Sequence, residues 1–310
     1  MRAPRTRGRY ASQKTTIGWI ALFSGPALAL YLLLVIVPII TAFVYGMFRW
    51  EGTSSAGFAG LSNYTELFQR YPENDEIRVA LWHNVLFFLG TMLIQNTIGL
   101  GLALLLHRLR AGKRFFQTLY SIPYLISPLI VGYIWSLLLS PNFGPVNAAL
   151  NGVGLGRFAL PWLGQPNTAL PVLILINAWQ WIGGPMLIFG AALGGVPREL
   201  EESAAIDGAA SWRIFWSIRF PLIMPAIGII TVLTFIGTFN TFDLVYALGG
   251  STGGPSGAMD VLGMVYYRLA FAGGTNAIGE SSAFAALMFL LVFGVALVLE
   301  RLLRRREVMA

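Results

Sequence analysis

The sequence has no cysteine, only two histidines and few charged residues, and each shortage narrows what the protein can be. Without cysteine there is no disulfide framework and no thiol chemistry. His83 and His107 stand far apart without ligand-like neighbours, so we expect no metal site. Charged residues make up 11% of the 310-residue chain, whereas a soluble domain carries about 25%. Such a chain cannot cover a globular surface with polar groups, and we expect lipid to solvate much of it.

Long apolar runs take the place of the missing charges: 56% of the residues are hydrophobic and the mean hydropathy is +0.67. A membrane-spanning helix needs about 20 mostly apolar residues. The runs are continuously apolar rather than alternating, which favours helices over a β-barrel, because a helix satisfies its own backbone hydrogen bonds in lipid. We therefore predict an all-α integral membrane fold with six transmembrane helices, at about 17–48, 81–106, 115–139, 168–193, 221–248 and 282–303.

The basic residues indicate the topology. Most of the 21 Lys and Arg residues lie at the two ends of the chain and in the gaps after the second and fourth apolar runs. Cytoplasmic loops are rich in these residues, so we predict cytoplasmic tails at 1–16 and 304–310 around a membrane domain at 17–303. The first apolar run is too long for the core of a signal peptide and is expected to be retained. The net charge of +7 follows these gaps rather than one face, so we expect no nucleic-acid partner.

One hydrophilic stretch, 197–219, interrupts the apolar runs between the fourth and fifth segments. Pro197 suits the first turn of a helix, and the helix dipole favours the acids Glu199, Glu201 and Glu202 that follow it. Asp207-Gly208 is typical of a turn, and a second short helix is expected after it. On these features alone, an amphipathic loop at the membrane surface is the favoured interpretation.

The order of residues in this stretch changes that interpretation. It contains Glu202-Ser203-Ala204, then Asp207-Gly208-Ala209, then Ile218 through Pro221. This order resembles the "EAA" loop of bacterial ABC importer permeases, E-A-A-x-x-D-G-A followed by I-x-L-P, with a serine and a phenylalanine as departures. In that family the loop is a coupling helix that docks into a separate ATP-hydrolysing subunit. The resemblance implies six coupling residues: Glu202, Ser203, Ala204, Asp207, Gly208 and Ala209.

The chain itself contains no G-x-x-x-x-G-K-[ST] phosphate-binding loop. We therefore expect a transport subunit that is not an enzyme and holds no cofactor. The resemblance implies that ATP and Mg²⁺ bind to partner subunits, so that only the assembled complex hydrolyses ATP.

Further segments are similar to sugar-type permeases of the maltose-transporter group. They include "FAGLSNYTELF" after the first apolar run, "TFNTFDLVYALGGSTGGP" at the end of the fifth, and "GESSAFAALMFLL" at the last. The resemblance covers nearly the whole chain and implies the type I ABC importer permease fold in a bacterial or archaeal plasma membrane. It also implies four kinds of partner: a sister permease, two ATP-binding subunits, an extracytoplasmic solute-binding protein and a sugar substrate.

Polar residues inside the apolar runs are costly unless they are paired, and they tend to mark a pathway. Amides and hydroxyls can bind sugar hydroxyls, and aromatic faces can cover sugar C–H groups. Polarity and the positions implied by the resemblance together predict a substrate site of Tyr124, Asn177, Gln180, Trp181, Gly184, Thr234, Thr238 and Asn240. A structural alternative stays open for each: threonines bond back to their own helix, glycines permit close packing, and Asn240 and Asp243 cap or kink a helix end.

Other functions stay open at this point. The same machine could import a polyol, glycerol phosphate or an amino acid, although arginines that would bind a phosphate are absent from the middle of the apolar runs. A stand-alone channel or secondary transporter would need ionisable coupling residues within the membrane, which the sequence nearly lacks. A membrane scaffold without transport activity is a third alternative.

Overall fold

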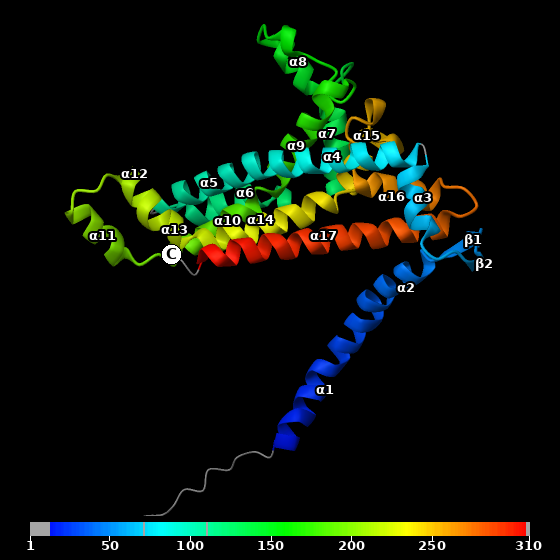
Figure 1. The fold of residues 1–310 in the computed structure, drawn as a ribbon. Helices are drawn as coiled ribbons and strands as arrows, with labels where there is room; N and C mark the ends of the chain where they lie inside the picture. Colours follow the sequence, from blue (N-terminus) through cyan, green and yellow to red (C-terminus); the bar gives the residue numbers. More distant parts are fainter. Residues whose placement is uncertain (1–12, 71, 110, 308–310) are drawn as a thin grey trace, which may run out of the picture.

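The computed structural model describes residues 13–70, 72–109 and 111–307, and it is mostly helical (Figure 1). Of the cytoplasmic tail predicted at 1–16, residues 1–12 lie outside the described residues. Helix α1 already begins at Gln13. The last helix continues four residues beyond the predicted boundary at 303. The main elements are α1 (Gln13–Tyr31), η1 (Leu32–Ile36), α2 (Val37–Tyr45), β1 (Phe48–Glu51), β2 (Ser54–Phe58), α3 (Ser62–Gln69), α4 (Glu73–Thr91), η2 (Met92–Asn96), α5 (Thr97–Arg108), α6 (Lys113–Ser121), η3 (Pro123–Leu125), α7 (Pro128–Leu138), α8 (Pro145–Gly152), α9 (Pro166–Trp181), α10 (Gly183–Gly194), α11 (Arg198–Ile206), α12 (Ser211–Ile214), η5 (Phe215–Arg219), α13 (Phe220–Leu222), α14 (Met224–Phe239), α15 (Asp243–Gly249), α16 (Leu262–Phe271) and α17 (Ala277–Glu307).

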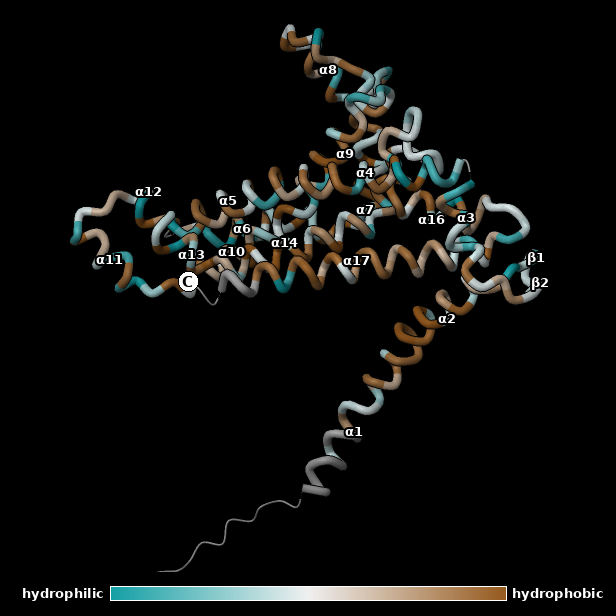
Figure 2. The backbone as a smooth tube through the Cα atoms, in the orientation of Figure 1, coloured by the Kyte–Doolittle hydropathy of each residue, from teal (hydrophilic) through white to brown (hydrophobic). Residues whose placement is uncertain are grey.

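Three uninterrupted helices among the described residues are long and apolar enough to cross a membrane: Leu22–Tyr45, Glu73–Arg108 and Ala277–Leu303. Two bent pairs qualify if each pair is one span. The pair α9 and α10 is bent by 49°, and Ser211–Leu222 with α14 by 65°. Figure 2 shows hydrophobic residues, in brown, along much of these helices. Length and composition thus give three to five spans, where the sequence pattern predicts six.

The missing sixth span is the one predicted at 115–139. The chain there forms α6, the short η3 turn and α7, and α7 is apolar but only 11 residues long. Pro123 and Pro128 each begin a new helix, because proline has no N–H to donate within a helix and disfavours helical conformation in the residue before it. The prediction of one continuous helix here is wrong, and the two prolines are the reason.

The span predicted at 221–248 is also interrupted. Helix α14 ends at Phe239, and Asp243 begins the separate helix α15 after a short non-helical link. Helix α15 packs against α7, whereas α14 packs against α17. The link therefore turns the chain from one helix layer to another.

A small antiparallel hairpin of β1 and β2 corrects the all-α prediction. Its turn contains Gly52, whose φ of +62° is readily adopted only by glycine. The fully buried Asn63 holds the hairpin against α3, because its Nδ2 donates to the carbonyl oxygens of Gly46 and Phe48 at 2.9 and 2.8 Å. Asn276, just before α17, donates in turn to Asn63 Oδ1 at 2.8 Å.

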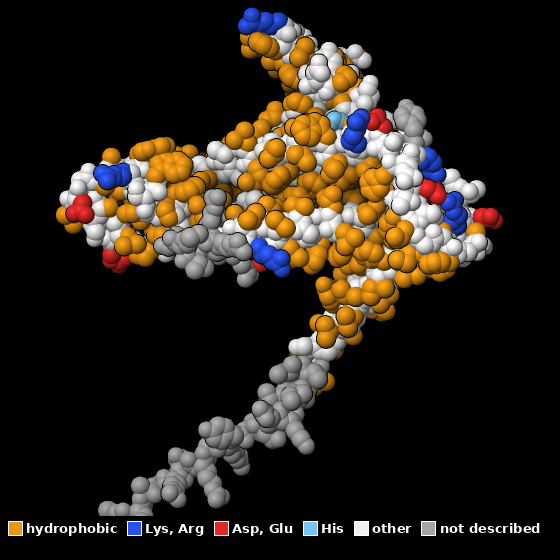
Figure 3. All heavy atoms as spheres, viewed as in Figure 1, with side chains coloured by type: hydrophobic (Ala, Val, Ile, Leu, Met, Phe, Trp, Pro, Cys, Tyr) orange, Lys and Arg blue, Asp and Glu red, His pale blue; other side chains and the backbone are white. Residues whose placement is uncertain are grey.

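The buried core follows the central helices. One apolar cluster joins α9 to α7 and α15, a second joins α14 to α17 and α4, and a third joins α10 to α5 and the start of α14. Lys, Arg, Asp and Glu lie mostly toward the two ends of the bundle, and hydrophobic side chains cover the face between them (Figure 3). A helical bundle that lies in lipid and has both ends in water requires this distribution.

Helices α1 and α2 leave the bundle as a long arm (Figure 1). None of the most apolar window of Leu22–Tyr45 is buried, and Phe23 and Leu34 are 76% and 67% exposed. Within the described residues, the helices of the bundle therefore provide no apolar cover for most of this arm.

Candidate functional site

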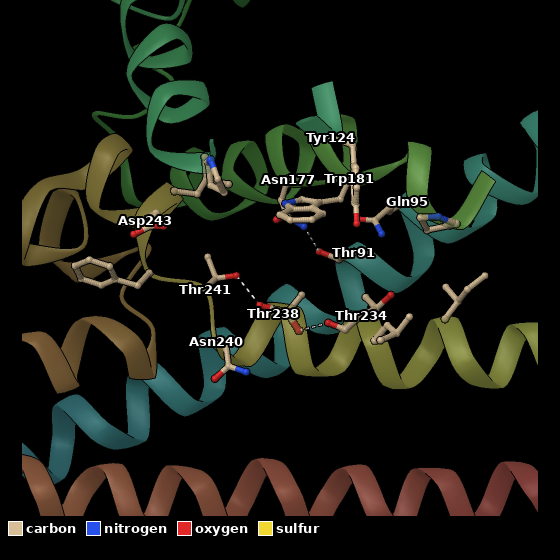
Figure 4. A pocket seen from close by; sticks show the side chains of 18 of the residues that line it. Thr91, Gln95, Tyr124, Asn177, Trp181, Thr234, Thr238, Asn240, Thr241 and Asp243 are labelled. Atoms are coloured by element: carbon tan, nitrogen blue, oxygen red, sulfur yellow. Dashed lines mark hydrogen bonds between the residues drawn. The ribbon is translucent and has the colours of Figure 1, made fainter. Parts of the chain in front are cut away.

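A cavity of about 430 Å³ lies among the central helices (Figure 4). Its walls come from the end of α4 with η2, from the η3–α7 turn, from α9 and α10, and from α14 with the link to α15. The lining residues are Thr91, Gln95, Tyr124, Pro128, Asn177, Trp181, Gly184, Pro185, Ile188, Ile230, Leu233, Thr234, Gly237, Thr238, Asn240, Thr241, Phe242, Asp243 and Leu244.

Seven of the eight residues predicted for the substrate site line this cavity: Tyr124, Asn177, Trp181, Gly184, Thr234, Thr238 and Asn240. Gln180 does not line it. That side chain is fully buried, and its Nε2 donates to the carbonyl oxygen of Ile126 at 2.9 Å, at the end of the η3 turn. Successive helical residues point about 100° apart, so Gln180 and its neighbour Trp181 face different surroundings. Gln180 thus lies outside the cavity lining that the other seven residues share, and its Oε1 has no partner in the described part of the chain.

The aromatic wall is built by Tyr124 and Trp181. Their rings meet edge to face, with centroids 5.0 Å apart and planes at 88°. Gly184 lies beneath Tyr124, where an added Cβ would come within 3.6 Å of the Tyr124 ring. Trp179, two residues before Trp181, instead contacts Trp135 of α7. As the helical spacing predicts, Trp179 and Trp181 point in different directions, and only Trp181 reaches the cavity.

The hydroxyls and amides on the walls are partly engaged with one another. Asn177 Nδ2 lies 3.5 Å from Thr91 Oγ1. On the opposite wall, Thr238 Oγ1 donates back to the Thr234 carbonyl oxygen at 2.9 Å, which is the structural alternative stated for these threonines. A back-bonded hydroxyl still presents acceptor lone pairs, so these groups can accept hydrogen bonds from a ligand.

The sequence interpretation missed Thr91 and Gln95, and it assigned Asp243 to helix capping. The consecutive polar residues Gln95 and Asn96, inside an otherwise apolar run, were the available signal. Asp243 lies in the first turn of α15, where the helix dipole favours an acid, and it also lines the cavity. It carries the charge among the lining residues, which include no Lys, Arg or His.

The stretch predicted to be a coupling loop forms two short helices at one end of the bundle (Figure 1). Helix α11 ends at Ile206, and the turn after it is closed by a hydrogen bond from Ala209 N to the Ala204 carbonyl oxygen at 2.9 Å. Gly208 occupies this turn with φ of +80°, a conformation that disfavours every residue with a Cβ. The exposed surface includes Glu202, Ser203, Asp207 and Gly208, and Ala204 and Ala209 are half-buried.

An ion pair ties α11 to the end of η5, from which the chain continues into α13 and α14. Arg219 donates from Nε and Nη2 to the two carboxylate oxygens of Glu201, at 2.6 and 2.7 Å. The hydrogen bonds from Arg219 hold the pKa of Glu201 below its ordinary value. Glu202, next in the chain, points to solvent instead. The apolar tips Ile206 and Trp212 are 86% and 72% exposed. The loop is therefore anchored on one side and offers an acidic and apolar surface on the other.

Comparison with known proteins decides the family. A family model described as "Binding-protein-dependent transport system inner membrane component" matches residues 95–308. The chain belongs to this family. It is thus a transport subunit of the ABC importer type, and its several apolar helices fit the family's description as an inner membrane component.

Two curated permeases illustrate the relationship. The "Probable starch degradation products transport system permease protein AmyD" of Thermoanaerobacterium thermosulfurigenes is 30% identical, over 94% of this chain and 95% of its own. The "sn-glycerol-3-phosphate transport system permease protein UgpA" of Yersinia pestis is 33% identical, over 81% and 82%. Among solved structures, a bacterial alginate ABC transporter in complex with an alginate pentasaccharide-bound periplasmic protein contains a similar chain. That chain has a TM-score of 0.77 at 22% identity, covering 95% of this chain and 98% of that one. This likeness establishes the permease fold.

Proposed function

We propose that this importer permease carries a neutral sugar or short oligosaccharide, and that the cavity is its half of the translocation pathway. One observation supports the proposal above the others. The cavity combines amides, hydroxyls and an aromatic corner with a lining that includes no Lys, Arg or His. Sugars need that mixture, because hydroxyls bind amides and their C–H faces pack on aromatic rings.

The relatives' names leave the substrate class open, since AmyD is named for starch degradation products and UgpA for sn-glycerol 3-phosphate. A phosphate group is normally bound by Arg, Lys or clustered backbone N–H groups. The charge that this cavity lining carries is the carboxylate of Asp243, which repels a phosphate. The lining therefore favours the neutral substrate.

Three exposed surfaces suit the partners of such an importer. The uncovered apolar arm of α1 and α2 suits a sister permease, which would bury it within the membrane. The acidic and apolar tip of α11 and α12 suits the cleft of an ATP-binding subunit, one for each permease of the pair. The opposite end, with the β1–β2 hairpin, would then face a solute-binding protein. This arrangement gives six spans, counting α6 through α7 as one, and both termini in the cytoplasm of a bacterial or archaeal cell.

In this proposal ATP and Mg²⁺ bind only to the partner subunits, and this chain contributes the pathway and the coupling loop. Closure of the ATP-binding subunits would move α11 by its exposed face. The Glu201–Arg219 pair would pass that movement to η5 and so toward α14, which carries Thr234 and Thr238 of the cavity wall. Alternation between outward-open and inward-open states then follows from the two positions of α11.

The test is reconstitution of this chain with its sister permease and ATP-binding subunits in proteoliposomes. Uptake of labelled maltose, maltotriose, sn-glycerol 3-phosphate and glutamate is measured with the solute-binding protein outside and ATP inside. We expect uptake of a neutral sugar that stops without ATP, and no ATP hydrolysis by this chain alone. Uptake of only the phosphate or the amino acid would refute the sugar assignment. Uptake that continues without ATP would instead favour a channel or a secondary transporter.

A further inference from the structure

The helix that crosses from Glu73 to Arg108 is interrupted at mid-length by a π-helical turn, η2. An extra residue in such a turn breaks the regular hydrogen-bond ladder, and π turns inside α-helices are frequent at functional sites. Thr91, just before this turn, and Gln95, within it, both line the cavity. None of the eight residues predicted for the substrate site lies in this helix. The helix therefore adds one more wall to the cavity.

The amide of Asn96 is already engaged. Its Nδ2 lies 2.9 Å from Met92 Sδ and donates to Thr234 Oγ1 on α14 at 3.2 Å. Its Oδ1 accepts from Gln95 Nε2 at 3.4 Å. Because both donors of Asn96 point elsewhere, the end of Gln95 that faces Asn96 is the NH₂ group. The carbonyl end of Gln95 is therefore turned away from Asn96.

That carbonyl oxygen has no partner. Gln95 is 5% exposed, and its Oε1 has no hydrogen-bond partner among the residues that the structure describes. A buried acceptor without a donor is unfavourable by about 1–3 kcal/mol, so native structures keep few of them without a purpose. Gln95 lines the cavity, so a ligand in the cavity is the available source of a donor.

We propose that Gln95 is a substrate-selecting residue whose side-chain carbonyl accepts a hydrogen bond from a hydroxyl of the transported molecule. The proposal rests on the proposed function, because it takes the cavity to be the substrate pathway. Its chemistry is specific: a hydroxyl can donate to this oxygen, whereas the oxygens of a phosphate dianion or a carboxylate cannot. Thr91, one turn away, and Asn177 opposite it complete a polar strip across the cavity.

The decisive variant is Gln95→Met, which keeps the length of the side chain and removes its polar atoms. It is compared with wild type in the reconstituted complex, on the substrate that the complex transports. It is also compared on the set of analogues in which one hydroxyl of that substrate is replaced by fluorine. Fluorine is similar in size to a hydroxyl but cannot donate. Gln95→Glu provides a rescue variant, because a buried carboxylic acid tends to be neutral and then offers a carbonyl acceptor in the same place.

For wild type, we expect one analogue to show a KM for uptake about fivefold higher than that of the parent substrate, as loss of one neutral hydrogen bond predicts. Gln95→Met should raise the KM for the parent by a similar factor and leave the KM for that analogue unchanged. Gln95→Glu should restore the preference for the parent. Gln180→Met is the matched control, because it removes an equally buried amide outside the cavity lining. Any effect of that control should fall equally on parent and analogue.

The proposal is wrong if Gln95→Met raises the KM values of the parent and all analogues by one common factor, or changes none of them. This outcome is separate from failure of the sugar assignment. If the complex transports sn-glycerol 3-phosphate, the sugar assignment fails. The same variants on the fluorinated forms of that substrate then still decide whether Gln95 reads a hydroxyl.

Discussion

The Glu201–Arg219 pair offers the sharpest test of coupling, because it joins the loop to the start of the α14 span. Two charge-assisted hydrogen bonds of 2.6 and 2.7 Å connect the side chains, which are 23% and 17% exposed. Hydrogen bonds to charged groups contribute about 1.5–3 kcal/mol, and fully exposed ion pairs about 0–1 kcal/mol. For this half-sheltered pair we expect about 1–2 kcal/mol, a shift of roughly 5- to 30-fold in the population of docked α11.

The perturbation is Glu201→Gln, which keeps the shape of the side chain and removes its charge. Backbone hydrogen exchange in α11 should become faster by that roughly 5- to 30-fold factor, because exchange reports the free energy of local opening. Stimulation of ATP hydrolysis by the loaded solute-binding protein should fall at the same time. Glu199→Gln is the matched control, since Glu199 lies two residues earlier in the same helix and forms no ion pair in the described part of the chain.

A charge swap tests the interaction between Glu201 and Arg219, apart from the effect of changing either residue alone. The double variant Glu201→Arg with Arg219→Glu should recover part of the protection of α11 and part of the stimulation of ATP hydrolysis, whereas each single reversal should lose both.

The pKa of Glu201 is lowered in the folded state, so the contribution of the pair to the stability of docked α11 is fully present above the ordinary glutamate pKa. That contribution is lost only as the pH falls through the lowered value. The protection factors of α11, which compare each exchange rate with that of an unstructured amide at the same pH, should therefore be insensitive to pH at neutral and mildly acidic pH. Equal exchange in Glu201→Gln and Glu199→Gln would refute the reasoning.

Further substitutions test the loop, the cavity and the packing. Gly208→Val should strain the turn by about 1–2 kcal/mol, because φ is +80° there, and should lower stimulated ATP hydrolysis although its Cβ meets no neighbour. Glu202→Lys should reduce co-purification of the ATP-binding subunits, and normal recovery would remove this residue from the interface. Asn177→Leu should impair uptake while assembly stays intact, and unchanged uptake would make Asn177 a packing residue. Gly132→Val should destabilise the contact of α7 with α15 by about 1–3 kcal/mol, measured as a lower midpoint of thermal unfolding, because its Cβ would lie 2.5 Å from Ala247 Cβ.

Much of the architecture follows from composition alone. Continuous apolar runs predict membrane helices, and 22–45, 73–108 and 277–303 match three of them closely. The pattern does not show where a span bends, because the apolar run continues through Pro123, Pro128 and Gly183. Those residues change the backbone without changing the hydropathy. A bend depends on the backbone conformation of one or two residues, and hydropathy summed over a window of residues cannot detect it.

The candidate site, too, could be predicted only in part from the sequence. Residue type and position in the family motifs brought seven residues to one cavity, since those features report which residues occupy the inward side of α9 and α14. They did not show that Gln180 lies outside the cavity lining, because its position depends on a hydrogen bond to the backbone carbonyl of Ile126, 54 residues earlier. They missed Gln95 because the π-helical turn alters the helical register there, and no sequence period reveals that turn.

The proposed coupling and transport roles fall on one continuous chain segment. From Ser211 the chain runs through η5 and α13 into α14, with a 65° bend between Leu222 and Met224. Arg219, held by Glu201, lies before this bend, and the cavity residues Thr234 and Thr238 lie after it. Pro221 and Pro225 flank the bend and remove backbone hydrogen bonds that would otherwise stiffen it.

A segment that is rigid on both sides of such a bend transmits displacement as rotation. In the proposed mechanism, movement of α11 would change the tilt of α14 and, with it, the distance between Thr234 and the buried Asn96 amide, which donates to Thr234 from outside the cavity lining. A tilt that moves α14 away from η2 would lengthen the 3.2 Å hydrogen bond between them. In the proposed mechanism this change of tilt would widen the cavity beside Thr234 in one state and narrow it in the other.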